Sequence, residues 1–268
     1  MFPRPLPTAA RKKRRPSRPR RTLAQRAKAT FARVKFASGI RVGGLELSPR
    51  MTRAQQRALT FWIRRLPAGI AAQLPRLKLA VADQLGSAQA HVFINEAPRG
   101  GELPLGNHLH AVSYIPQRYV VLQRDLFRRR VELGRIFYHE LCHFLWPRLG
   151  NPRRRSYEAV LRQEVREGTR GELGYSAQWR KEQLRANGNS SRRKAGRRER
   201  WRDYVCESFC DTGSFVLLGP ERRANHSEYT LSRAARQHRR RWVALVLGVE
   251  ASRDGKRIPT AFVLGATP

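Results

Sequence analysis

The sequence predicts an α+β fold, in which a small β-sheet packs on two helices that carry histidine and acidic residues. Short apolar runs typical of strands occupy positions 77–82, 91–95 and 112–122, and they predict strands. Segments with helical periodicity follow at 124–146 and 201–218. The 268 residues, 40% of them hydrophobic, are enough for one sizeable domain.

Taken in chain order, the first element is a helix that Ser48 and Pro49 start and that runs through Arg65. It should face the core with Leu59, Trp62, Ile63 and Leu66. Pro116 interrupts the third strand run, and the Gly/Pro-rich residues 97–107 predict a connecting loop. A last basic helix is expected from Ser227 and Glu228 to about Val246, with a terminal strand at 258–264.

Positive charge is concentrated in two stretches. The chain has 55 Lys and Arg against 20 Asp and Glu, a net charge of +35. Residues 1–45 hold 14 of these basic residues and no acidic one, which predicts a disordered basic arm. Residues 46–268 are expected to form a single domain, with a basic insertion at about 151–202 that carries 16 basic and 6 acidic residues. Both stretches suit non-specific contact with nucleic acid, or serve only as solvated segments.

The cysteine content and the hydrophobic pattern indicate a cytoplasmic protein. Three cysteines do not make a disulfide framework, which favours a reducing compartment. The apolar runs are too short to span a bilayer, so no membrane partner is expected.

The predicted helix at 124–146 contains an HExxH motif, His139-Glu140-Leu141-Cys142-His143. Histidines four residues apart lie on one helical face, so both imidazoles can reach one metal ion. Glu140 is then placed beside the ion, where it can take a proton from water. In a purely structural alternative, the helix is buried without a metal, and its histidines and glutamate pair with each other or with Arg135.

A second apolar helix supplies two carboxylates four residues apart, Glu207 and Asp211. Zinc bound by two histidines needs a third protein ligand, and Glu207 can provide it while Asp211 holds a ligand imidazole by its other nitrogen. Three protein ligands leave one position open for water. Glu158, Glu164 and Glu167 are rival third ligands; the latter two lie in an Arg-rich stretch that looks solvated.

His139-Glu140-x-x-His143 followed by Glu207-x-x-x-Asp211 resembles the gluzincin type of zinc metallopeptidase. The order of sheet, HExxH helix and glutamate helix is similar to that of the minimal ImmA/IrrE-like and SprT-like members, over roughly residues 77–220. The resemblance implies that His139, His143 and Glu207 bind one Zn2+ ion, that Glu140 is the base and that Asp211 supports a ligand. The segment between His143 and Glu207 is longer than in minimal members.

The expected function is hydrolysis of a peptide bond in a protein or peptide substrate. Zinc would polarise a water molecule and the substrate carbonyl, while Glu140 passes the proton of that water to the leaving amine. An oxyanion donor is also expected, and His226, Tyr229 and Tyr204 are equal candidates. The alternative is a non-enzymatic nucleic-acid-binding protein with at most a structural metal.

The remaining metal-binding and aromatic residue types receive structural roles. Small cysteines on apolar helices usually pack in the core, and this is expected of Cys142, Cys206 and Cys210. The same holds for the tryptophans, which should fill the core or its edge. These are Trp62, Trp146, Trp179, Trp201 and Trp242. The histidines without ligand spacing are His91, His108, His110 and His238, and no role is assigned to them.

Overall fold

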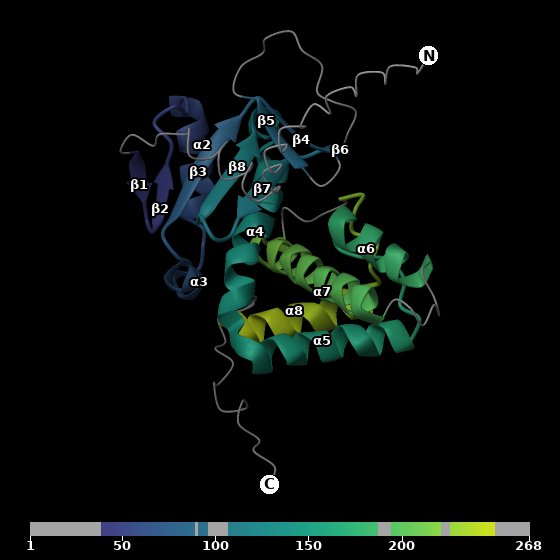
Figure 1. The fold of residues 1–268 in the computed structure, drawn as a ribbon. Coiled ribbons are helices and arrows are strands. Elements are labelled where there is room, and N and C mark those ends of the chain that lie inside the picture. The colour runs from purple at the N-terminus through teal and green to yellow at the C-terminus, as the bar shows by residue number, and fades with distance from the viewer. Residues whose placement is uncertain (1–38, 89–90, 96–106, 187–193, 221–225, 250–268) are drawn as a thin grey trace, which may run out of the picture. The chain divides into compact units, whose positions relative to one another are not determined.

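The computed structural model describes residues 39–88, 91–95, 107–186, 194–220 and 226–249 (Figure 1). The chain divides into two units, residues 1–35 and 36–268, and all described residues belong to the second. Most of the expected basic arm, the loop at 97–106 and the expected strand at 258–264 lie outside the described residues.

The described strands form two sheets (Figure 1). In the five-stranded sheet the order is β1-β2-β3-β8-β7; β3 is parallel to both of its neighbours, and the outer pairs are antiparallel. A smaller antiparallel sheet has the order β5-β4-β6. The strands are β1 (Ile40–Val42), β2 (Leu45–Leu47), β3 (Leu77–Ala82), β4 (Gln84–Ala88), β5 (His91–Asn95), β6 (Asn107–His108), β7 (Ala111–Tyr114) and β8 (Tyr119–Gln123).

The strands expected at 77–82 and 91–95 are confirmed, and the run at 112–122 is a hairpin of two strands. The hairpin turns at Pro116, where Arg118 has a positive φ of 54° and donates its N–H to the Ile115 carbonyl at 3.2 Å. The hairpin of β1 and β2 shows that the folded part begins before residue 46, within the expected arm.

The helices are α2 (Arg53–Ile63), α3 (Ala68–Gln73), α4 (Arg130–Leu145), α5 (Gly150–Arg166), α6 (Tyr175–Ala186), α7 (Lys194–Leu217) and α8 (Arg233–Leu247). Short 3-10 helices precede and follow α4, at Arg124–Arg128 and Trp146–Leu149. The expected N-terminus of the first helix is wrong, because Thr52 and Gln55 form a capping box that starts α2. The last helix also starts later than expected, after Ser232 rather than Ser227.

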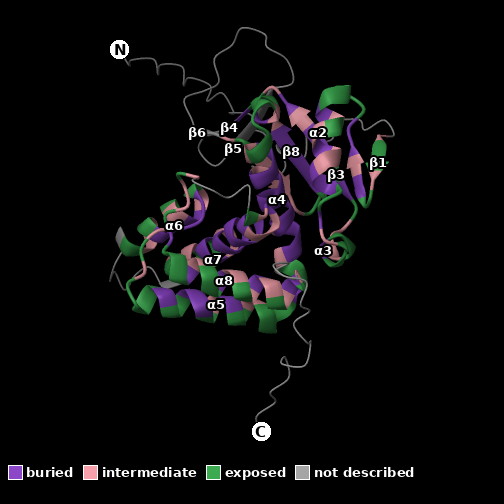
Figure 2. Ribbon diagram, turned by 180° about the vertical axis from the view of Figure 1, so that it is seen from behind, coloured by how far each residue is buried: buried purple, intermediate pink, exposed green. Residues whose placement is uncertain are grey.

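Helix α4 lies at the centre of the core, between the five-stranded sheet and helices α5, α6, α7 and α8 (Figure 2). The expected core face of α2 is confirmed, since Leu59, Trp62, Ile63 and Leu66 are buried. Trp62 packs against Gly134 of α4, where a Cβ would come within 2.5 Å of the indole. Tyr138 of α4 also donates its hydroxyl to the Trp62 carbonyl at 2.9 Å. These contacts fix α4 against α2.

The basic segment at 151–202 is part of the folded core rather than a solvated insertion. It forms α5, α6 and the start of α7, and Figure 1 shows α5, α7 and α8 side by side. Its buried side chains include Tyr157, Leu161, Leu173 and Ala177. Trp179, which was expected in the core or at its edge, is 48% exposed.

A buried ionic network joins these helices. The Arg239 guanidinium of α8 is fully buried and bonds both Glu164 of α5 and Glu172 of the following loop. Lys181 of α6 bonds Glu172 at 2.9 Å, so two positive and two negative charges balance. The prediction that Glu164 is solvated is therefore wrong. Charges buried in this way need their partners, because an unpaired one is very costly.

Among the described residues, none of the helices combines the length and the hydrophobicity that a bilayer crossing needs.

Candidate metal centre

The predicted site residues come together where α4 and α7 cross. His139, Glu140 and His143 lie on α4, and Glu207 and Asp211 lie on α7. The two helices approach closely because Gly213 of α7 has no side chain. A Cβ there would lie 2.5 Å from the Cys142 sulfur of α4. This close approach brings the α7 carboxylates within reach of the α4 imidazoles.

His139 is held between the two acids. Its Nδ1 lies 2.7 Å from Asp211 Oδ1, and its Nε2 lies 3.3 Å from Glu207 Oε2. Burial favours the neutral ring, but the two carboxylates outweigh it and raise the pKa of His139 well above its ordinary value. When the ring is neutral, Nδ1–H donates to Asp211 and the Nε2 lone pair faces Glu207. Asp211 thus occupies the position that was predicted for it.

Asp211 is itself fixed by the start of α6. Its Oδ2 accepts the N–H of Ala177 at 3.4 Å, in the first turn of that helix, where the helix dipole favours a negative charge. Gly174 makes the approach possible, since a Cβ there would lie 2.4 Å from the Asp211 carboxylate. The loop before α6 therefore helps to orient His139 through Asp211.

His143 faces the same carboxylate from one turn further along α4. Its Nε2 lies 4.0 Å from Glu207 Oε2, and its Nδ1 lies 3.8 Å from the Cys206 sulfur. The pKa of His143 is raised, because the contacts with Cys206 and Glu207 outweigh the effect of burial. Cys206, expected to be a packing residue, is thus half-buried beside a predicted ligand. Contact with Cys210 and His143 lowers the pKa of its thiol to about 6, against the effect of burial.

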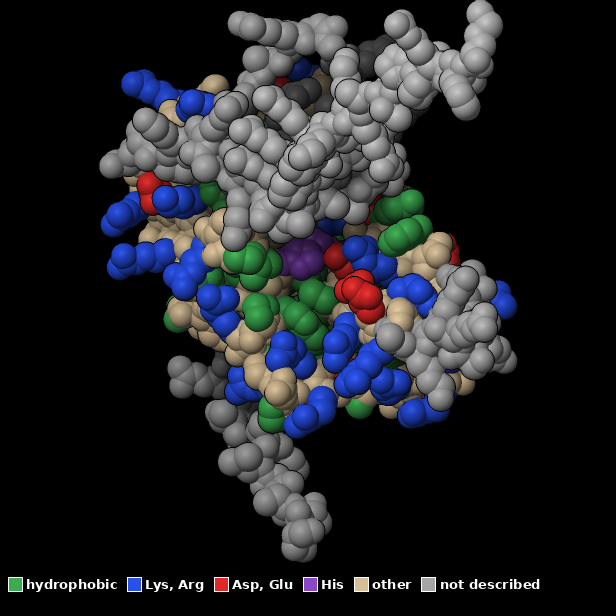
Figure 3. Space-filling view, viewed as in Figure 1, with side chains coloured by type: hydrophobic (Ala, Val, Ile, Leu, Met, Phe, Trp, Pro, Cys, Tyr) green, Lys and Arg blue, Asp and Glu red, His purple; other side chains and the backbone are tan. Residues whose placement is uncertain are grey.

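The two carboxylate oxygens of Glu207 have different partners, the histidines for one and the guanidinium of Arg180 for the other. Its Oε1 lies 3.2 Å from the Arg180 guanidinium of α6, while Oε2 faces both rings. Burial would raise the pKa of Glu207, but the two imidazoles and Arg180 lower it to about 2. The site also reaches the surface, because the side chains of Glu207 and His143 are 14% and 19% exposed. Figure 3 shows histidine at the surface between acidic and hydrophobic side chains.

One pair of donor atoms already has the spacing that a zinc ion requires. In a tetrahedral site with bonds of about 2.0–2.1 Å, neighbouring donor atoms lie about 3.3–3.4 Å apart. Glu207 Oε2 is 3.3 Å from Nε2 of His139, which matches this spacing, and 4.0 Å from Nε2 of His143, which is longer. Two imidazoles and a carboxylate are also ligand types that zinc accepts.

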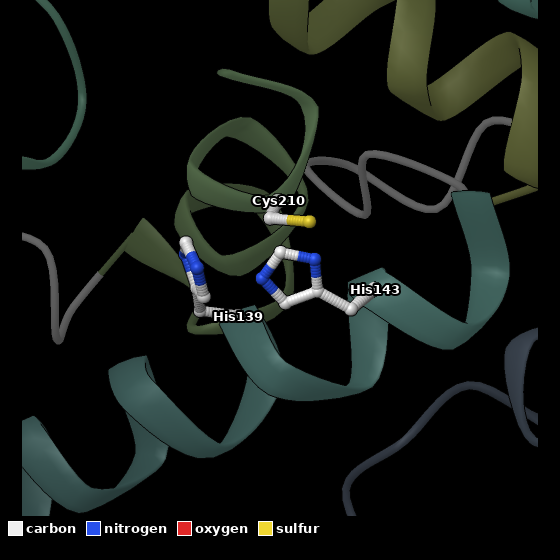
Figure 4. A group of neighbouring side chains, drawn as sticks. All are labelled: His139, His143 and Cys210. Carbon is white, nitrogen blue, oxygen red and sulfur yellow. The ribbon is translucent and has the colours of Figure 1, made fainter. Parts of the chain in front are cut away.

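Cys210 is a rival third donor (Figure 4). One donor atom each from His139, His143 and Cys210 lie within 4.8 Å of one another. Cys210 is fully buried, however, and burial together with Cys206 raises the pKa of its thiol well above the ordinary value. We favour Glu207, because its Oε2 lies near the Nε2 atoms of both rings and its side chain is partly exposed.

Glu140 lies beside this group and is bonded to the sheet. The Ser113 hydroxyl of β7 donates to Glu140 Oε2 at 2.5 Å and to the Glu140 carbonyl at 3.2 Å. Arg135, the alternative partner, is bonded instead to Glu132 and Glu228. The predicted alternative in which Arg135 pairs with Glu140 therefore does not hold within the described residues. The carboxylate of Glu140 is instead bonded to a neutral hydroxyl.

The rival ligands are engaged elsewhere. Glu164 bonds Arg239, and Glu158 bonds Arg162 and the Trp201 indole. Glu167 accepts from a neighbouring glutamine on α5.

The three candidate oxyanion donors also have other contacts. Tyr204 is buried and donates its hydroxyl to Glu172 at 2.6 Å, so this candidate is engaged elsewhere. His226 Nε2 bonds Glu132 at 3.0 Å, and Tyr229 packs its ring against His226. None of these contacts points to a role at the metal centre.

Sequence reasoning missed Ser113, Arg180 and Gly174. Each acts across a long sequence separation and belongs to a residue type that is common on surfaces or in loops. No spacing rule singles them out.

No protein-family model matches the sequence, and comparison with curated proteins and with solved structures gives no match. The chemistry of the site is therefore argued from its residues.

Proposed function

We propose that the protein is a zinc-dependent metallopeptidase. The observation that carries the proposal is the convergence of His139, His143 and Glu207, with Asp211 bonded to the far nitrogen of His139. Zinc bound there would supply a Lewis acid that lowers the pKa of a water molecule and polarises a carbonyl group. The partial exposure of the site supports a catalytic rather than a closed structural centre.

The chain's own residues have distinct tasks in this reaction. Glu140 accepts a proton from water and delivers it to the amine that leaves. Ser113 holds Oε2 of this carboxylate, so the orientation of Glu140 is set before substrate binds. Arg180 holds the outer oxygen of Glu207 and leaves the inner one directed at the histidines.

The edge strand β7 supplies a place for a peptide backbone. Among the described strands it pairs with β8 only, and its Ser113 touches Glu140. An extended peptide can add to such an edge through main-chain hydrogen bonds. The carbonyl to be cleaved would then lie beside the metal centre, which supports a peptide or protein as substrate.

Metal analysis combined with a proteolysis assay tests the proposal. The purified protein should contain about one zinc per chain, and His139→Ala should lose it. Glu140→Gln should keep the zinc but lose cleavage of an unfolded protein substrate such as casein. The matched control is Glu132→Gln, two turns earlier on α4, which should retain cleavage if the variant folds. Cleavage that survives in Glu140→Gln would refute the proposed mechanism.

The third ligand is tested separately. Glu207→Gln should weaken zinc binding strongly, whereas Cys210→Ser should leave zinc content close to that of the unaltered protein. The reverse result would assign the third ligand to Cys210.

A further inference from the structure

A second site lies among the helices, apart from the metal centre. A cavity of about 670 Å3 opens between α5, α6 and the start of α7. This volume is in the range of small-molecule sites, about 300–1,000 Å3. Among the described residues, nine side chains line the cavity, of which six are basic and none is acidic. The lining consists of Arg162, Val165, Arg166, Lys181, Leu184, Arg185, Arg197, Arg198 and Trp201.

Three of these cations are available to a ligand. Arg166, Arg197 and Arg198 are exposed, and they form no ion pair with any described residue. The other three are engaged: Arg162 with Glu158, Lys181 with Glu172, and Arg185 with a backbone carbonyl. Three like charges gathered around one concave surface attract an anion that can bridge them. Figure 3 shows how widely Lys and Arg cover the helices on the face that it draws.

Trp201 lines the cavity, but its ring already has neighbours. The Arg162 guanidinium lies 4.6 Å from the centre of its ring, and the Tyr204 ring lies 5.5 Å away, centroid to centroid. Its indole N–H also donates to Glu158 at 2.7 Å. Base stacking is the usual basis of single-strand recognition, so here the available interaction is charge and hydrogen bonding from guanidinium groups.

We propose that this cavity binds a chain of phosphate groups through Arg166, Arg197 and Arg198. A guanidinium group can donate two parallel hydrogen bonds to the oxygens of one phosphate. A linear chain of phosphates could therefore contact all three arginines. Two sources share this chemistry, a free polyphosphate and the backbone of a nucleic acid. Because the Trp201 ring already contacts Arg162 and Tyr204, binding of a nucleic acid should not depend on stacking of the nucleic-acid bases. The site is independent of the proposed peptidase activity.

Protection from arginine modification tests the proposal on the full chain. Phenylglyoxal labels exposed arginines, and peptide mass spectrometry reads the rate at each position. With tripolyphosphate or an oligothymidylate at ten times its Kd, labelling of Arg166, Arg197 and Arg198 should slow about tenfold, in proportion to the unliganded fraction. Arg153 and Arg233, exposed and outside the cavity, should label at an unchanged rate.

The two probes also identify the source. Protection by tripolyphosphate alone supports a free polyphosphate, and protection by the oligonucleotide alone supports a nucleic-acid backbone. Protection by both supports the shared phosphate chemistry. The proposal is overturned if neither probe protects the three arginines, or if the control arginines are protected equally.

Paired variants provide a second test for an oligonucleotide. Arg166→Gln/Arg197→Gln/Arg198→Gln should reduce the slope of log affinity against log salt by about 2, since each lost contact to a single strand removes about 0.7. The control, Arg153→Gln/Arg155→Gln/Arg233→Gln, removes the same charge from positions outside the cavity. Equal changes in slope for both variants would show general attraction to a basic chain and would overturn a nucleic-acid ligand in the cavity.

Discussion

Replacing Asp211 by Asn should weaken zinc binding without removing any ligand. Asp211 accepts two hydrogen bonds, from His139 Nδ1 at 2.7 Å and from the Ala177 N–H at 3.4 Å. The two donors bond different oxygens of the carboxylate, and an amide has only one oxygen, so Asn cannot keep both bonds in this arrangement. If its oxygen stays on His139, its NH2 group opposes the Ala177 N–H. If it turns, the NH2 donates to Nδ1 and moves the ring proton to Nε2, the atom that should bind zinc.

Either arrangement reduces the affinity of His139 for the metal. Partners of this kind contribute about 10–100-fold to metal affinity, which corresponds to about 1.4–2.7 kcal/mol. The assay is competition with a chromophoric chelator at pH 7.5. The control is Asp203→Asn, two turns earlier on α7 at an exposed position, which should bind zinc normally. The reasoning is refuted if Asp211→Asn binds zinc as tightly as the unaltered protein.

Three further predictions follow from the packing and the charges. Gly174→Ala should displace Asp211 and lower zinc affinity several-fold, measured by the same competition; an unchanged affinity would show that the loop does not position this acid. Arg239→Met should lower the free energy of unfolding in urea by about 3–5 kcal/mol, because buried carboxylates lose their main cation; a loss below about 1 kcal/mol would contradict this. Zinc affinity should fall as pH drops, and the fall should begin above pH 6.5. The reason is that the pKa of His139 is raised, so protons compete with the metal for this ring at a higher pH than for an ordinary histidine; constant affinity from pH 9 to 6.5 would contradict this prediction.

The same charges set the stability of the metal-free protein. His139 has a raised pKa in the folded state, so its contribution is complete below its ordinary pKa and is lost as pH rises through the raised value. Glu207 has a pKa lowered to about 2, so its contribution is present above about pH 4.5 and is lost as pH falls toward 2. Metal-free protein should therefore be most stabilised by this pair in mildly acidic solution.

Local pattern was enough to predict the central elements. The strand at 77–82 and the apolar periodicity of α2 were both predicted, and the core face was predicted for α2. The histidines of α4 and the acids of α7 were predicted for the same reason, since residues four apart share a helical face. That α7 would pack its acids against α4 also depends on Gly213, whose role only the packing shows.

Long-range electrostatics could not be predicted in this way. Glu164 looked solvated because its neighbours in sequence are arginines, yet its partner Arg239 lies 75 residues away. The basic segment at 151–202 looked like an insertion for the same reason. Ser113 and Arg180 reach the site from a strand and a helix whose local sequences carry no chemical signature. Burial of a charge depends on a partner that only the fold supplies.

X-ray absorption at the zinc edge, on protein loaded with one equivalent of zinc, tests the central claim most directly. The structure predicts a shell of nitrogen and oxygen donors at about 2.0–2.1 Å that includes two imidazoles. A sulfur donor at about 2.3 Å would assign the third position to Cys210, and failure to retain zinc would contradict the metal centre altogether.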